Sequence, residues 1–146
     1  MSLDLDPSLA HGDRDSRAFW SAVRDGRLLL QRCSACRRAR FPAMPGCPYC
    51  GSPDATEEAA SGRGTVYSWI TVHRALDADH ADEVPYSVAV VTLEEGPRAV
   101  GRFVPGRPPR FDEPVTLAVT PSRRSGVLWF APLDEAADED PDRRSP

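Results

Sequence analysis

Between residues 64 and 132 the chain alternates short apolar runs with polar, turn-forming segments. The first run, at 64–74, has a period of two that sets Val66, Ser68, Ile70 and Val72 on one face against Tyr67, Trp69, Thr71 and His73. Three clear runs follow at 86–95, 98–104 and 114–120, and a shorter one at 126–132. This periodicity predicts five strands, with a hairpin tip at 94–98. The spacing favours a small barrel such as an OB-fold, with a small sandwich as the alternative.

The N-terminal part of the chain has a different pattern. Residues 17–24 predict a short helix that begins after Asp15 or Ser16, ends at Gly26, and has Phe19, Trp20 and Val23 on one face. RLLLQRC, at 27–33, predicts a strand, and the polar segment SPDATEEAASGRG, at 52–64, predicts a connector. The helix is expected to dock either on a partner or on its own lobe through Phe19 and Trp20.

All four cysteines lie between residues 33 and 50, in two Cys-x-x-Cys pairs. Two intervening residues let one tight turn direct both sulfurs to the same point, and a hairpin between the pairs brings them together. The pattern predicts a zinc ribbon with the ligands Cys33, Cys36, Cys47 and Cys50. Four thiolates leave no open coordination position, so the zinc is expected to be structural. A redox dithiol and rubredoxin-like iron are the alternatives.

These elements divide the chain into four parts. We expect a flexible leader at 1–14, the helix and zinc ribbon at 15–60, an OB-fold at 61–133, and a disordered tail at 134–146. The tail is acidic and lacks apolar periodicity. The predicted fold class is therefore mainly β with a short N-terminal helix, in which a four-cysteine rubredoxin-like zinc ribbon precedes a five-stranded OB-fold barrel.

Charge and composition narrow the function classes. Lysine is absent, which excludes a lysine Schiff base and a Walker-type lysine. Residues 14–40 are rich in arginine, but without the acidic tail the body is nearly neutral, which suits a local anionic ligand or partner better than a long polyanion. The N-terminus has no apolar signal sequence and no run is long enough to span a membrane, so we expect a cytoplasmic protein.

The motifs in combination resemble a known family. The chain has a predicted helix that contains FW, followed by DGRLLLQRCSACRRARFPAMPGCPYCGS, GRGTVYSWITVHR and PYSVAVVTLEEGPRAVGRFV. In this combination it resembles the rubredoxin-like zinc-ribbon plus OB-fold proteins called domain-of-unknown-function family thirty-five. The likeness covers about residues 17–130. Arg37 and Arg38 depart from the pattern, because a glycine often follows the second cysteine of the first pair; this affects the expected turn and not the ligands.

The resemblance implies a non-catalytic subunit that binds acyl-CoA or acts as a scaffold. Its partner is then a thiolase-fold enzyme or a MaoC-like hydratase, which supplies the catalytic groups, in a hetero-oligomer of lipid, steroid or polyketide metabolism. The alternative is a binder of single-stranded nucleic acid, since zinc ribbons and OB-folds both occur in such proteins. The near-neutral body and the absence of lysine count against this alternative.

Several side chains are candidates for contact with CoA or a partner. Arginine forks suit phosphate oxygens, and the arginines on or beside the predicted barrel strands are Arg63, Arg74 and Arg102. A basic run near the first cysteine pair adds Arg37 and Arg38. Tyr67 and Trp69 are expected to share a face with His73 and to stack on an adenine, or to belong to the core or a partner interface. Solvated surface is the alternative for every arginine, and His73 is expected at a surface or interface because no catalytic triad pattern surrounds it.

Overall fold

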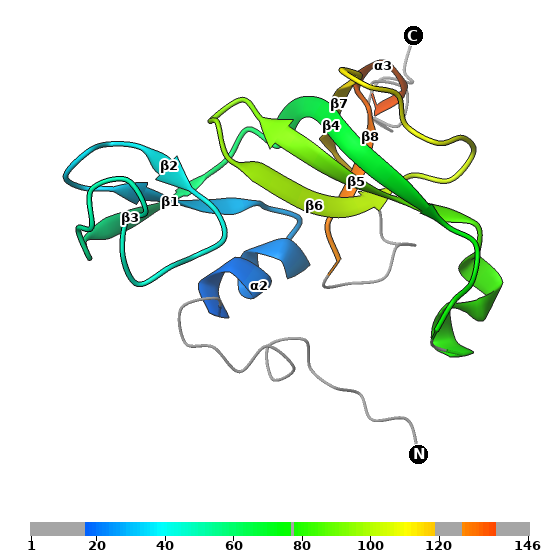
Figure 1. Cartoon of the computed structure of the whole chain (residues 1–146), viewed down its shortest axis with the longest axis horizontal. Coiled ribbons are helices and arrows are strands. Elements are labelled where there is room, and N and C mark those ends of the chain that lie inside the picture. Colours follow the sequence, from blue (N-terminus) through cyan, green and yellow to red (C-terminus); the bar gives the residue numbers. More distant parts are fainter. Residues whose placement is uncertain (1–16, 77, 119–126, 137–146) are drawn as a thin grey trace, which may run out of the picture.

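The computed structural model describes residues 17–76, 78–118 and 127–136. They form a small three-stranded sheet and a closed five-stranded barrel, which lie side by side with a short helix beneath them (Figure 1). Within this part of the chain, no helix has the length and apolarity needed to cross a membrane.

The N-terminal lobe begins with helix α2 (Arg17–Arg24), followed by β1 (Leu29–Cys33), β2 (Ala39–Arg40) and β3 (Ala55–Ala59). The sheet order is β2-β1-β3, with antiparallel pairing throughout. β3 lies in the segment predicted as a connector, so that prediction is wrong. The strand forms because its backbone pairs with the whole of β1, while Glu57 faces solvent and Glu58 accepts a 2.7 Å hydrogen bond from Arg32 Nε.

The barrel strands are β4 (Arg63–Val72), β5 (Tyr86–Leu93), β6 (Arg98–Phe103), β7 (Pro114–Leu117) and β8 (Trp129–Pro132). They close in the order β4-β5-β6-β8-β7, and β7 pairs with β4. β8 runs parallel to β6, and all other pairs are antiparallel. This is the predicted five-stranded OB-fold. A short 3-10 helix, η1 (Ala78–Glu83), connects β4 to β5, and helix α3 (Leu133–Ala136) follows β8.

A β-bulge in β4 overturns one prediction about its faces. Val66 lies opposite Val91 and is fully buried, but the register shifts before Ser68, which lies opposite Val90. The extra residue, Tyr67, reverses the alternation beyond it, so Ile70 lies on the outside and is 63% exposed. Strict alternation predicted that Val66 and Ile70 share a face, and this prediction is wrong.

A single hydrophobic core joins the two lobes. Its buried members include Val23, Leu28, Leu30 and Ala39 from the first lobe and Val66, Ala89, Val91, Leu93, Ala99, Phe103, Val115, Leu128 and Phe130 from the barrel. Phe19 and Trp20 pack against this cluster, and the ring of Phe19 lies 5.3 Å from that of Phe41 in the ribbon. Helix α2 thus packs on its own lobe through Phe19, and Trp20 contacts the core that the two lobes share.

The predicted leader and tail fall mostly outside the described residues. Residues 1–14 are not among them, and neither are residues 137–146. Residues 134–136, predicted as the start of a disordered tail, belong to α3 instead.

Candidate functional site

The four predicted metal ligands come together at one end of the ribbon. The sulfurs of Cys33, Cys36, Cys47 and Cys50 all lie within 4.8 Å of one another. Cys33 Sγ is 3.6 Å from Cys50 Sγ, and Cys36 Sγ is 3.6 Å from Cys47 Sγ. A zinc ion with Zn–S bonds of about 2.3 Å places its sulfurs about 3.8 Å apart at the corners of a tetrahedron. The cysteine cluster therefore has the size and donor set of a zinc site.

Each cysteine pair is held by a turn of the same form. Arg37 N donates to Cys33 O at 3.0 Å, and Gly51 N donates to Cys47 O at 2.8 Å. The two donors are four residues after the first cysteine of each pair, and both have left-handed backbones, with φ of 64° at Arg37 and 78° at Gly51. The arginine that departs from the family pattern thus adopts the backbone conformation that glycine favours.

The backbone of each turn also favours a thiolate at the first cysteine of its pair. A hydrogen bond from the backbone N–H of Cys36 lowers the pKa of Cys33. Burial alone would raise the pKa of Cys47, but the backbone N–H groups of Tyr49 and Cys50 outweigh it and lower this pKa to about 6. Zinc binds deprotonated cysteine, so the backbone prepares these ligands for a cation. Bound zinc would link the two turns, and all four of its positions would be occupied by sulfur.

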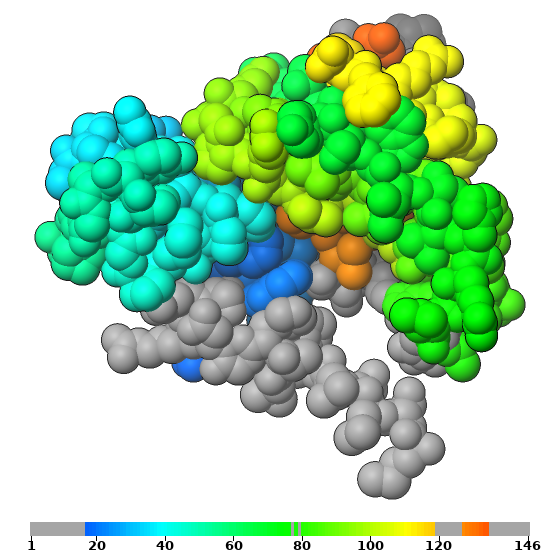
Figure 2. Space-filling view, in the orientation of Figure 1, coloured from blue at the N-terminus to red at the C-terminus, as the bar shows by residue number. Residues whose placement is uncertain are grey.

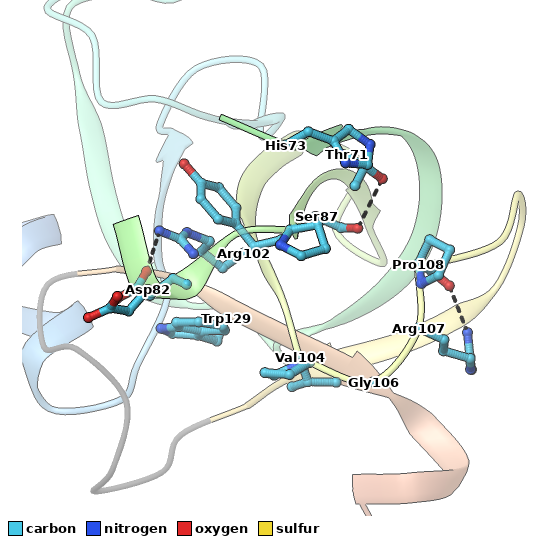
Figure 3. Close-up of a pocket in the computed structure, with 14 residues that line it drawn as sticks. Thr71, His73, Asp82, Ser87, Arg102, Val104, Gly106, Arg107, Pro108 and Trp129 are labelled. Carbon is cyan, nitrogen blue, oxygen red and sulfur yellow. Dashed lines mark hydrogen bonds and ion pairs between the residues drawn. The ribbon is translucent and has the colours of Figure 1, made fainter. Parts of the chain in front are cut away.

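A second feature is a cavity of about 730 Å³ at the end of the barrel where β4 and β6 finish (Figure 3). Its volume is in the range of small-molecule sites. Charged and aromatic lining residues are His73, Asp82, Glu83, Tyr86, Arg102, Arg107 and Trp129. Two candidates from the sequence, His73 and Arg102, therefore meet in one cavity.

Arg102 is the central cation of this cavity. Its guanidinium carbon lies 3.4 Å from the ring centre of Tyr86 and 5.6 Å from that of Trp129, and Figure 3 shows it beside Trp129. Arg102 Nη2 donates to Glu83 Oε2 at 2.8 Å. Arg102 Nη1 is buried and has no hydrogen-bond partner among the described residues. Because a buried donor without a partner is costly, Nη1 is a ready donor for an anionic ligand.

Each arginine of the cavity is paired with a glutamate, Arg102 with Glu83 and Arg107 with Glu113. Burial alone would raise the pKa of Glu83, but hydrogen bonds from His80 and Arg102 outweigh it, so this pKa lies below its ordinary value. Hydrogen bonds from Arg107 hold the pKa of Glu113 below its ordinary value, although burial opposes them. Both carboxylates are therefore ionised near neutral pH, and they hold the arginine side chains in place.

The remaining candidates lie away from the cavity lining. Arg63 forms an ion pair with Glu94, and Arg74 is exposed. Trp69 packs on Phe111, with ring centres 4.6 Å apart. Tyr67 is 52% exposed, and the guanidinium carbon of Arg98 lies 3.5 Å from its ring centre. The bulge separates Tyr67 from the alternation that would group it with Trp69 and His73.

The basic run beside the first cysteine pair lies on the ribbon. Arg37 and Arg38 are both exposed. Arg38 lies over the ring of Tyr49 from the second pair, 4.7 Å from its centre. This contact connects the two cysteine turns, and neither Arg37 nor Arg38 lines the barrel cavity.

Sequence reasoning missed most of the cavity. Tyr86 and Trp129 begin strands that were predicted, and Arg107 stands in a segment that reads only as a turn. Their shared location arises from the barrel closure, which sets Trp129 beside Arg102 in the parallel β6–β8 pair. A single sequence carries no local signal for that pairing.

Comparisons with known proteins agree with this two-lobe architecture. The profile described as "ChsH2, rubredoxin-like zinc ribbon domain" matches residues 20–56, and "ChsH2, C-terminal OB-fold domain" matches residues 57–120. A chain in the solved structure of the "Ltp2-ChsH2(DUF35) aldolase" is 37% identical, with a TM-score of 0.71, over 82% of this chain and 95% of that one. The chain belongs to the ChsH2/DUF35 family.

Two curated relatives extend the comparison. The "Probable enoyl-CoA hydratase alpha subunit" of Thermomonospora curvata is 44% identical over 63% of this chain and 28% of its own length. The "DUF35 domain-containing scaffold protein" of Methanocaldococcus jannaschii is 35% identical over 61% of this chain and 64% of its own length. The present ChsH2/DUF35 chain thus spans less than two thirds of either relative.

Proposed function

We propose that the chain is an accessory subunit that binds acyl-CoA and acts as a scaffold for an enzyme that processes the acyl group. The partner is a thiolase-fold enzyme, of thiolase, ketosynthase or aldolase type, or a MaoC-like hydratase of lipid, steroid or polyketide metabolism. The close relation to a ChsH2/DUF35 chain of an aldolase supports this reading, as do the curated relatives described as a scaffold protein and a hydratase subunit.

The observation that carries the proposal is the arginine-lined cavity at the end of the barrel. Arg102 offers a buried donor for a phosphate oxygen, and Tyr86 and Trp129 offer flat apolar surfaces to the adenine or the pantetheine chain of CoA. The predicted zinc site is closed by four sulfurs, so the catalytic groups are expected on the partner.

Binding of CoA is tested by isothermal titration with CoA and with dephospho-CoA. Arg102→Gln is expected to weaken CoA binding about tenfold or more, because it removes a charge-assisted hydrogen bond. Arg63→Gln is the matched control, since Arg63 is exposed and pairs with Glu94 away from the cavity lining. Equal affinity of the wild type and Arg102→Gln for CoA contradicts the cavity assignment.

The accessory role is tested by co-expression with a thiolase-fold or MaoC-like enzyme taken from the same genome. We expect the two proteins to elute together and the enzyme to lose activity when this chain is omitted. Two proteins that elute separately and are independently active contradict the proposal. Turnover of an acyl-CoA by the isolated chain also contradicts it.

A further inference from the structure

The outer face of β4, β5 and β6 carries a cluster of apolar side chains beside the polar Ser68 and Thr92. Ile70 lies opposite Val88, and Val90 lies opposite Val100, so these four side chains form neighbouring rows on one side of the sheet. Ile70 is 63% exposed and Val100 is 56% exposed. We call these four residues the outer β face; the green and yellow-green surface of β4, β5 and β6 is uncovered in Figure 2. Val88 and Val90 are half-buried beside Ile70 and Val100, and apolar side chains that gather on a solvent-facing sheet favour an interaction site.

The outer β face runs between an arginine and the cavity. At one end, the bulge sets Tyr67 on the outside, where the guanidinium of Arg98 stacks on its ring. No carboxylate pairs with Arg98 in the part of the chain that the structure describes, and its side chain is exposed. At the other end, Val88 lies opposite Arg102, which lines the cavity. A protein seated on this face therefore reaches the cavity directly.

We propose that the outer β face docks the acyl-CoA-processing enzyme subunit, and that Arg98 pairs with a carboxylate of that subunit. The inference rests on the proposed accessory function and names its contact surface. A CoA held beside Arg102 leaves its acyl group to a neighbouring protein, and the apolar surface adjoining the cavity is the outer β face. Arg98 is already positioned by Tyr67, so less side-chain entropy is lost when a carboxylate binds it.

Charge favours an enzyme partner over a second copy of this chain. The outward positions of β4, β5 and β6 carry Arg63, Arg98 and Arg102 but no aspartate or glutamate, and the exposed Glu94 that follows β5 is already paired with Arg63. Two copies paired through this face would bury two Arg98 side chains without an acid between them, which is unfavourable. A different protein with an acidic rim around an apolar centre avoids this penalty.

The test measures the dissociation constant between this chain and the thiolase-fold or MaoC-like enzyme used in the co-expression experiment. Ile70→Glu, Val100→Glu and Arg98→Glu are each expected to weaken binding about tenfold or more. The altered side chains at Ile70 and Val100 are more than half exposed, so the melting temperature should change little. Leu76→Glu is the matched control, because Leu76 is an apolar residue that is 99% exposed and lies off the face.

The outcomes separate this inference from the function on which it rests. Failure of the wild-type chain to bind the enzyme overturns both proposals. Equal affinity of the enzyme for the wild type and for Ile70→Glu, Val100→Glu and Arg98→Glu overturns the docking surface and leaves the accessory function standing. A dimer of the isolated wild-type chain in light scattering, dissociated by Val100→Glu, identifies a second copy as the occupant and also overturns the inference.

Discussion

At the residue scale, the two cysteine turns have different residues in the left-handed conformation, Arg37 in the first turn and Gly51 in the second. Gly51 has φ of 78° and open space where a Cβ would stand, so its replacement by alanine adds backbone strain and no clash. We expect Gly51→Ala to reduce the free energy of unfolding by about 1 kcal/mol. Gly46→Ala is the control, because that glycine is not in the left-handed region. Urea unfolding of the zinc-loaded proteins measures both, and an equal loss at both positions contradicts the strain argument.

The cysteine ligands could be predicted from the sequence, but most of the cavity could not. Two Cys-x-x-Cys pairs predict a metal site directly, because their spacing along the chain determines which sulfurs come together. Arg107 and Trp129 meet Arg102 only through strand pairings between distant segments. Their residue types are ordinary in turns and strands, so nothing local distinguishes them.

At the element scale, the connection between β6 and β7 is held by an ion pair between Arg107 and Glu113. Glu113 also accepts a 2.9 Å hydrogen bond from Arg110 N, and its side chain is 11% exposed. Its pKa is lowered in the folded state, so it contributes stability above the unfolded pKa of about 4.3 and loses it as pH falls through the folded pKa. We expect Glu113→Gln to cost about 2 kcal/mol at pH 7 and much less at pH 3.

Urea unfolding at both pH values measures this effect, with each variant compared with the wild type at the same pH so that metal loss at low pH affects both alike. Glu57→Gln is the control, because Glu57 is exposed on β3. If Glu113→Gln lowers the free energy of unfolding equally at both pH values, the loss comes from the changed shape of the side chain and not from its charge. That result contradicts the prediction.

Elements with a clear period were predicted well, and those stabilised mainly by backbone pairing were not. The helix at Arg17–Arg24 agrees with the aromatic and apolar spacing, and all five barrel strands coincide with apolar runs. β3 has the composition of a connector because its edge position exposes Glu57. The bulge at Tyr67 is equally hidden, since a one-residue insertion leaves the run of strand-forming residues unchanged.

At the scale of the whole molecule, the metal is expected to hold the first lobe together. Its strands are short and the described lobe has few buried apolar residues, so removal of zinc by a chelator should unfold the ribbon and weaken partner binding. Metal analysis, circular dichroism and partner binding measure this, with Cys33→Ser as the ligand variant and Ser34→Ala as the exposed neighbouring control. A metal-free Cys33→Ser protein that keeps its fold and its partner contradicts the structural role, and iron in the metal analysis contradicts zinc.

The shared core further predicts that the two lobes unfold together. Leu28 is 1% exposed and belongs to the same buried cluster as the barrel residues, so Leu28→Ala should lower the free energy of unfolding by about 3 kcal/mol. With Trp20 of helix α2 replaced by phenylalanine in every protein compared, tryptophan fluorescence follows the barrel through Trp69 and Trp129, and a colorimetric zinc chelator follows the ribbon. We expect both signals to shift to the same lower urea concentration, whereas Leu76→Ala, at a 99% exposed position, should move neither. Because a continuous core transmits the loss of packing from β1 to the barrel, a zinc-release midpoint that moves while the fluorescence midpoint stays fixed would show that the lobes are independent.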